Sequence, residues 1–309
     1  MDVLTDLLNR ARARTVLVRR LVQRPPWSIT FADPPPLTVL ATLGGRAALR
    51  LDDGEPTRLE PGDIALVSAT REHTIADDPA TADQITIRGG HKYLPTGEPT
   101  SAQLLAPRTY GTGGPGATVV LRAAYELHSE VSDRLLTLVP PLAVVPAGPR
   151  TGATLDLLSA EVARDEPGQD AVLARLLDLV LVQALRAWWA EAGRPPAWYS
   201  ALADPAVGEA LRLLHDDPAR RWTVAELAGK AGLSRAAFAA RFTALVGEPP
   251  LRYLTGWRLT LAADLLRDTE KTVAAVAHET GYADAFAFSV AFRRARGVSP
   301  SVWRQGIAR

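Results

Sequence analysis

The last third of the chain contains an internal repeat, which limits the possible folds more than any other feature of the sequence. Its matched positions are apolar residues, glycines, helix caps and prolines. An offset of 49 residues matches Val224, Leu227, Ala228 and Gly232 with Val273, Val276, Ala277 and Gly281. An offset of 50 residues matches Ser234, Phe238, Phe242, Gly247, Pro250 and Tyr253 with Asp284, Phe288, Phe292, Gly297, Pro300 and Trp303. The one-residue insertion falls in a turn, where insertions are tolerated best.

Each copy of the repeat predicts a short helix, a turn that contains glycine and a second helix. Thr223 and Glu226 have the spacing of a capping box, and Ser234 is placed to cap the second helix. In the second copy Thr272 and Asp284 occupy the same capping positions. Two helices joined by a short turn with glycine are typical of the helix-turn-helix motif that binds DNA.

Between the two copies, residues 249–268 predict one continuous helix of about 28 Å. A helix of this length would hold the second helices of the two copies about one duplex turn, or roughly 34 Å, apart on one side of DNA. One chain would then contact two successive segments of the major groove.

The charge distribution indicates the same kind of partner. Residues 205–309 hold 15 Lys and Arg against 10 Asp and Glu, a net charge of +5, whereas residues 1–204 hold 20 against 24, a net charge of −4. A basic C-terminal third on an acidic remainder predicts a polyanionic partner for that third alone.

The N-terminal part has a different pattern, with short apolar runs separated by turn residues. Between residues 25 and 95 the runs are LTVLATL, RAALRL, TRLEPGDIALVS, HTIAD and QITIRGG. Turn signals at intervals of about ten residues favour a small antiparallel barrel or sandwich. Residues 111–117 predict a loop, and residues 119–127 predict a closing strand.

From about residue 151 the apolar spacing changes to the helical period. The run at 171–189 contains Arg175, Asp178 and Arg186, which a membrane-spanning helix would bury at a high cost. We therefore expect no contact with a membrane. We interpret 169–192 as a helix at a homodimer interface, with packing inside the monomer as the alternative.

The chain has no cysteine, which excludes disulfides and thiolate metal sites. The N-terminus MDVLTDLLNRARART predicts an amphipathic helix and lacks the apolar stretch of a secretory signal. A cytoplasmic location fits both features best.

The C-terminal motifs VAELAGKAGLSRAAFAARFTALVGEPPLRYLTGWRL and VAAVAHETGYADAFAFSVAFRRARGVSPSVWR resemble the AraC/XylS (arabinose-regulator) family of bacterial transcription factors. The resemblance implies that base contacts come mostly from Ala236, Ala239, Ala240, Phe286, Ser289 and Val290. No long polar side chain stands at Ala240 or Val290, where this family commonly has one. We therefore expect sequence reading through thymine methyl groups, through Ser289 and Thr243, and through DNA shape.

Arginines flank the same two helices and are suited to phosphate contacts, which supply salt-dependent affinity. They are Arg235, Arg241, Arg293 and Arg294, with Arg258 and Arg304 as further candidates. The inward stripes predicted for the two helices are Phe238, Phe242 and Leu245, and Phe288, Ala291, Phe292 and Ala295. The apolar pair Phe286 and Val290 leaves a second interpretation open, in which this patch docks on the sensor domain until an effector binds.

The N-terminal part resembles the cupin-type sensor domain of the same family. In LEPGDIALVSATREH, Gly62 and His73 have the separation of the second cupin box, but RAALRLDDGE has none of the histidines of the first box. We therefore expect no metal and no cofactor.

A small-molecule effector is the expected ligand of this domain, because small barrels can enclose one. The candidate contacts are Trp27, His73, Arg88, His91 and Tyr93. The two glycines of RGGHKY would let the backbone approach a ligand closely, or would mark an ordinary bulge.

Together these features predict an α+β protein with three parts. An antiparallel cupin-like β-barrel occupies residues 1–147, a helical linker with dimerisation helices 148–203, and an all-α AraC-type DNA-binding domain 204–309, with helix-turn-helix units at 224–245 and 273–296. The predicted function is a non-enzymatic, effector-responsive transcription regulator that binds double-stranded DNA as a homodimer. Two alternatives stay open: a metal-dependent cupin enzyme with a helical appendage, and a partner-binding module whose helices no longer read DNA.

Overall fold

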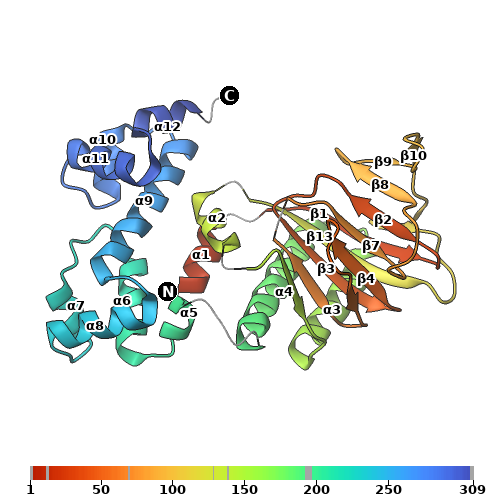
Figure 1. Ribbon diagram of the computed structural model, residues 1–309, viewed down its shortest axis with the longest axis horizontal. Coiled ribbons are helices and arrows are strands. Elements are labelled where there is room, and N and C mark those ends of the chain that lie inside the picture. The colour runs from red at the N-terminus through yellow and green to blue at the C-terminus, as the bar shows by residue number, and fades with distance from the viewer. Residues whose placement is uncertain are drawn as a thin grey trace. The chain divides into compact units, whose positions relative to one another are not determined.

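The computed structural model describes residues 3–11, 14–68, 70–127, 129–137, 139–191 and 197–306. The chain folds into two compact units (Figure 1). The sheet unit comprises residues 13–127 and 136–193, and the helical unit comprises residues 1–12, 128–135 and 194–309. Short N-terminal and central segments therefore belong to the same unit as the C-terminal third. The domain boundaries given above stay a prediction.

The sheet unit contains two seven-stranded sheets. The first has the strand order β11-β12-β1-β13-β3-β6-β14, with β1 (Arg14–Gln23), β3 (Leu37–Gly44), β6 (Ile64–Val67), β11 (Leu104–Ala106), β12 (Thr109–Gly111), β13 (Thr118–Glu126) and β14 (Leu142–Val145). The second has the order β10-β9-β8-β2-β7-β4-β5, with β2 (Ser28–Phe31), β4 (Ala47–Leu51), β5 (Thr57–Leu59), β7 (His73–Ala76), β8 (Ile85–Arg88), β9 (His91–Tyr93) and β10 (Pro99–Thr100).

The apolar runs predicted as strands form β3 to β8 and β13, which confirms the cupin-like sheet architecture. The β1–β12 and β2–β8 pairs are parallel, and the other pairs among the described strands are antiparallel. The sequence analysis did not find β1 or β2. The basic residues of β1 interrupt its apolar alternation, and β2 has only four residues.

Apolar side chains from both sheets meet in one core between them. Phe31, Leu49 and Ile75 come from the second sheet, and Leu40 and Val120 come from the first. Because side chains alternate along a strand, every second residue of these strands points into this core. Residues that are paired across neighbouring strands face the same side of a sheet, so the strand register determines which residues face the core.

Two helices, α3 (Pro149–Val162) and α4 (Gln169–Glu191), pack beside β1, β3 and β14 of the first sheet (Figure 1). Tyr125 of β13 donates a hydrogen bond to the Leu177 carbonyl of α4 at 3.0 Å. One face of α4 is buried inside this unit, whereas Val172 and Leu179 stay exposed at 44% each. The buried residues of this face include Leu173, Leu177, Val180, Leu181, Leu185 and Trp189.

The helical unit contains the remaining helices. They are α1 (Val3–Ala11), α2 (Glu130–Leu136), α5 (Ala197–Ala201), α6 (Pro205–Asp216), α7 (Val224–Lys230), α8 (Arg235–Val246), α9 (Pro250–Asp268), α10 (Val273–Glu279), α11 (Ala285–Arg296) and α12 (Pro300–Gly306). The 19 residues of α9 give a rod of about 28 Å that joins the two copies of the repeat.

Candidate functional site

The first helix-turn-helix unit consists of α7 and α8. The Thr223 side chain accepts a hydrogen bond from the Glu226 N–H at 3.1 Å, and the Thr223 N–H donates to the Glu226 carboxylate at 3.0 Å. These two bonds form the predicted capping box. Gly232 lies in the turn with φ at +66°, a left-handed conformation that glycine adopts without strain.

The second unit, α10 and α11, repeats this construction. Thr272 accepts from the Ala275 N–H at 3.2 Å, and Gly281 occupies the turn with φ at +83°. The second helix of each unit starts at a side-chain cap, since Ser234 accepts from Ala237 and Asp284 accepts from Ala287. The repeat in the sequence is therefore a repeat of caps and turns.

Two phenylalanine pairs hold the second helices in place. Phe238 and Phe242 of α8 are fully buried with ring centroids 5.8 Å apart, and Phe288 and Phe292 of α11 are fully buried at 5.5 Å. Leu245 and Ala291 are half-buried, as an inward position requires. Ala295 is exposed, so its predicted inward position is wrong. In the last turn the residue that faces inward is instead Arg296, four residues after Phe292. Since a helix has 3.6 residues per turn, the inward position can fall three or four residues after the previous one.

The outer faces of α8 and α11 are open to solvent. Phe286 is 81% exposed and Val290 is 55% exposed, which is unusual for side chains of this size. The other residues expected to contact bases or phosphates are exposed or half-buried: Arg235, Ala236, Ala239, Ala240, Arg241, Thr243, Ser289, Arg293 and Arg294. Their role in DNA contact stays a prediction.

The two hydroxyl side chains on these faces are bonded within their own helices. Thr243 donates to the Ala239 carbonyl at 2.8 Å, and Ser289 donates to the Ala285 carbonyl at 2.7 Å. Each hydroxyl oxygen still has lone pairs available. In this arrangement the hydroxyls can accept from a base amino group, such as that of adenine or cytosine.

The arginines divide into two groups. Arg241 pairs with Asp204, the N-cap of α6, through Nε at 2.8 Å and Nη2 at 2.5 Å. In contrast, Arg235, Arg293 and Arg294 are exposed and pair with none of the residues that the structure describes. Among the expected phosphate contacts, these three arginines therefore have side chains that no other described residue pairs with.

The remaining two arginine candidates are bonded to backbone carbonyls. Arg258 donates to the Pro218 and Arg220 carbonyls at 2.6 and 2.8 Å. Arg304 donates to the Leu266 carbonyl at 3.1 Å and to that of Lys271. These guanidinium groups connect the turns of the helical unit. Their contact with phosphates stays a prediction.

A buried polar chain joins α1 to α6 and α9. Asp6 accepts from His215 Nδ1 at 2.7 Å, and His215 Nε2 accepts from the Tyr253 hydroxyl at 2.7 Å. Burial lowers the pKa of His215 although the hydrogen bond to Asp6 opposes this, so the ring is neutral. The pKa of Asp6 is lowered, because bonds from His215 and Arg10 outweigh the effect of burial. Each of the three buried groups thus has a partner.

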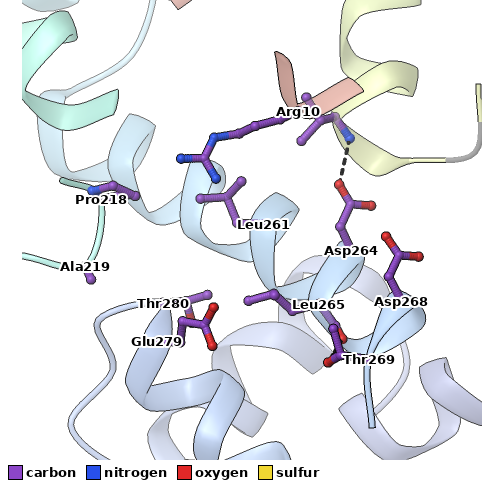
Figure 2. A pocket seen from close by; sticks show the side chains of 11 residues that line it. Arg10, Pro218, Ala219, Leu261, Asp264, Leu265, Asp268, Thr269, Glu279 and Thr280 are labelled. Atoms are coloured by element: carbon purple, nitrogen blue, oxygen red, sulfur yellow. Dashed lines mark hydrogen bonds between the residues drawn. The ribbon is translucent and has the colours of Figure 1, made fainter. Parts of the chain in front are cut away.

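The central segment of the helical unit forms α2, and the N-terminus of α2 is capped by a residue far along the chain. Asp264 of α9, which Figure 2 labels, accepts from the Glu130 N–H at 2.7 Å and from the Val131 N–H at 3.3 Å. Burial raises the pKa of Asp264, and the N–H of Glu130 opposes this. The Glu130 carboxylate in turn pairs with Arg296 of α11 at 2.8 Å. The central segment is therefore bonded directly to the second helix of the second helix-turn-helix unit.

Beside this contact lies a pocket of about 280 Å³ (Figure 2). Arg10 comes to it from α1, Leu261 and Asp264 from α9, and Glu279 and Thr280 from the end of α10. Its side chains come from the N-terminal helix, from the connecting helix α9 and from the second copy of the repeat. No local pattern in the sequence indicates this arrangement, since the contacts join residues more than 130 positions apart.

In the sheet unit, two of the five candidate effector contacts lie inside. Trp27 is 3% exposed and belongs to the core between the sheets. His73 is fully buried, and its ring is stacked on Phe31 with centroids 5.0 Å apart. Burial and the nearby positive charge of Arg122 lower the pKa of His73 to about 4, so this ring is neutral at ordinary pH.

The other three candidates lie around the β8–β9 turn. Arg88 and His91 are exposed and stand opposite each other in the register of β8 and β9. Tyr93 is half-buried. Gly89 and Gly90 have φ of +56° and +77°, as the two central residues of a tight hairpin require. Lys92 faces inward instead, because it pairs with Ile87 of the core. Its neighbours His91 and Tyr93 accordingly face the other way.

No helix among the described residues is long and apolar enough to cross a membrane. Within the same residues, no three His, Asp or Glu side chains lie close enough together to hold a metal ion. The single cupin histidine, His73, therefore has no partner ligand in the described part of the chain.

Comparison with known proteins identifies both units. A family model described as cupin matches residues 2–190, and one described as helix-turn-helix domain matches residues 227–306. A putative AraC-like transcription regulator of Streptomyces lividans is 35% identical over 99% of this chain and 98% of its own. The chain belongs to the AraC-like transcription regulators. Another such regulator, from Streptomyces antibioticus, is 35% identical over 99% of each chain.

The helix-turn-helix transcriptional regulator AlkR of Acinetobacter baylyi is 29% identical to this AraC-like regulator over 85% of the chain and 86% of its own length. The family prediction is thus confirmed, as are the cupin-like sheet architecture and the helical DNA-binding part. The regulator combines a cupin-like sensing domain with an AraC-type helix-turn-helix domain that binds DNA.

Proposed function

We propose that this regulator controls transcription by inserting α8 and α11 into two successive segments of the major groove. The observation that carries this proposal is the matched pair of helix-turn-helix units on a single rod, α9, each with an exposed outer face. Positive charge that phosphates attract comes from Arg235, Arg293 and Arg294, which pair with none of the described residues. Base reading falls to the side chains between them.

We further propose that the regulator works as a cytoplasmic homodimer. The support is a group of large apolar side chains left exposed on the two sheet-unit helices: Leu157 of α3, at 51%, and Val172 and Leu179 of α4. Val172 and Leu179 are seven residues apart and lie on one helical stripe. A second copy that covers this stripe would remove it from water.

A small-molecule effector bound in the sheet unit would adjust DNA binding. The support is the path of the chain, since β13 leaves the core and α2 begins four residues after it ends. The same α2 is capped by Asp264 and bonded to Arg296 of α11. A shift of β13 on effector binding would therefore pull on a helix that contacts the DNA-reading unit.

One experiment tests the DNA and dimer proposals together. A DNA site is selected from random sequence with the full chain and is then footprinted with hydroxyl radicals. We expect two protected segments one helical turn apart for each bound chain, and four such segments for a dimer. Uniform protection without an enriched sequence would contradict base reading. A single protected segment would contradict the use of both units.

A further inference from the structure

Three positively charged side chains gather on the inner faces of the two sheets. Arg19 of β1 and Arg122 of β13 pair directly across the first sheet. Leu40, the next residue in that row, belongs to the core, so the row faces inward. In the second sheet one transverse row runs through His73, Phe31, Ile87 and Lys92. Phe31 and Ile87 are core residues, which places Lys92 on the inner face as well.

The cationic side chains of the two rows contact two aromatic rings. The guanidinium carbon of Arg122 lies 4.1 Å from the centre of the Phe31 ring. Arg19 and Lys92 both lie over the ring of Tyr110, at 5.3 and 5.0 Å. Three cations and two rings from both sheets thus form one cluster, which we call the inner basic cluster.

The inner basic cluster lacks a counter-charge. Arg122 is 6% exposed, and its Nε is buried without a hydrogen-bond partner. The Arg19 side chain donates to the adjacent Val18 carbonyl at 3.0 Å. Within the described part of the chain no carboxylate pairs with Arg19, Lys92 or Arg122. The repulsion is visible in the pKa values, since burial and then Arg19 lower the pKa of Arg122 to about 10 and also lower that of Lys92.

An uncompensated buried charge destabilises a folded protein strongly. Arginine cannot avoid this by releasing its proton at ordinary pH. Ring contacts compensate only part of the lost hydration. A cluster of this kind is therefore expected where an anion completes it, because a guanidinium group matches the two oxygens of a carboxylate or phosphate.

Exposure along the inner basic cluster also indicates an entrance. Arg122 is buried, whereas Arg19, Lys92 and Tyr110 are half-buried. These three come from β1, β9 and β12, and β1 is the neighbour of β13, which carries Arg122. A ligand that entered past Lys92 and Arg19 would meet Arg122 and Phe31 at the inner end.

We propose that the inner basic cluster binds a small organic oxyanion, a carboxylate or a phosphate ester with an apolar body, and that this is the effector class of the regulator. Its charged group would pair with Arg122, Arg19 and Lys92, and its body would lie against Phe31 and Tyr110. This inference rests on the proposal that the sheet unit senses a small molecule. The proposed ligand contacts are therefore inner residues that the sequence did not reveal, and they differ from the exposed Arg88 and His91 of the sequence prediction.

Thermal unfolding of the full chain at constant ionic strength tests the proposal. The probes are benzoate and phenyl phosphate, with benzamide as the neutral ring. We expect either anion at saturation to raise the Tm by at least about 3 °C, and benzamide to leave it unchanged. The anion with the larger effect distinguishes a carboxylate site from a phosphate site.

Variants separate binding from structure. Arg122→Gln should lose the anion-dependent rise, and its Tm without anion should equal or exceed that of the wild type, because an uncompensated charge is removed. Lys92→Gln, at a half-buried position, should reduce the rise. Arg88→Gln is the matched control, since Arg88 is exposed on the neighbouring strand, and should keep the full rise.

Two results would overturn the inference. One is a wild-type Tm that responds to neither anion more than to benzamide. The other is an Arg122→Gln variant that is less stable without anion but keeps the full rise, as a structural arginine would give. The footprint on selected DNA is measured with the same protein, so a normal footprint with no anion response would reject the oxyanion site and leave the DNA proposal intact.

Discussion

The outer face of α8 carries Ala236, Ala239, Ala240 and Thr243, whereas the matched positions of α11 carry Phe286, Ser289, Val290 and Arg293. The caps, turn glycines and buried phenylalanines of the two units are alike. Features that build the helix-turn-helix therefore recur in both copies, and features that would touch DNA do not. The two helices therefore present different side-chain chemistry on the same framework.

The small side chains of α8 would let its backbone come close to the base edges. The large apolar side chains of α11 would instead fill space in the groove and contact thymine methyl groups. The arginines differ as well, since Arg241 of α8 is held by Asp204 while Arg293 and Arg294 of α11 have no partner among the described residues. We expect α11 to contribute more of the phosphate contacts.

The largest expected effect concerns the framework and tests how alike the two units are. A Cβ added at Gly281 would lie 2.4 Å from the Ala219 carbonyl oxygen, but a Cβ at Gly232 would meet nothing within 4 Å. Gly281→Ala should lower the free energy of unfolding by about 3 kcal/mol or more, through this clash and the positive φ. Gly232→Ala, the matched control, should lower it by about 1–2 kcal/mol from φ alone.

Urea unfolding of the full chain, followed by circular dichroism, measures both glycine variants. Equal losses for the two would mean that the second turn is not packed against the 218–220 loop as the structure describes. If both variants lost little free energy of unfolding, neither the clash with Ala219 nor the positive φ would require glycine at position 281.

The next effect concerns the arginines. Arg293→Gln should weaken binding to selected DNA by about 1.5–3 kcal/mol and reduce the slope of log affinity against log salt by about one, because one phosphate contact is lost. Arg241→Gln is the matched control, because its partner Asp204 belongs to the protein. It should change affinity little and stability by about 0.2–1 kcal/mol.

Binding titrations at several salt concentrations measure these two variants. A loss of salt dependence in Arg241→Gln equal to that in Arg293→Gln would show that Arg241 leaves Asp204 on DNA. The proposed division of the phosphate contacts between α8 and α11 would then be wrong.

The helical unit was largely predictable because its signals are local. Caps such as Thr223 and Ser234, and turn glycines such as Gly232, act within a few residues, so their spacing identifies each helix-turn-helix. The attachment of α1 and α2 was not predictable. The Asp6–His215 bond joins residues 209 positions apart, and nothing near Asp6 in the sequence indicates its partner.

The inner basic cluster was missed for a different reason. In β13 both faces are buried, one by the second sheet and one by α4, so apolar residues occur at nearly every position and alternation does not reveal that Arg122 points inward. Lys92 is assigned to the inner face through its register with Ile87 and its contact with the Tyr110 ring, and neither is visible in the sequence. The register between β8 and β9 depends on the hairpin turn at Gly89 and Gly90. In the sequence alone these glycines indicate mainly a place where a ligand could approach the backbone.

The central claim is that α11 reads DNA through apolar contacts and α8 does so through close approach of small side chains. The most direct test replaces thymine by uracil, one position at a time, in each protected segment of the selected DNA and measures affinity for the wild type and for Phe286→Ala. Each methyl group lost opposite α11 should weaken wild-type binding by about 0.8 kcal/mol, or about fourfold, and Phe286→Ala should lose this sensitivity at one position or more. The account would be contradicted if uracil had no effect anywhere in that segment, or if wild type and Phe286→Ala responded alike.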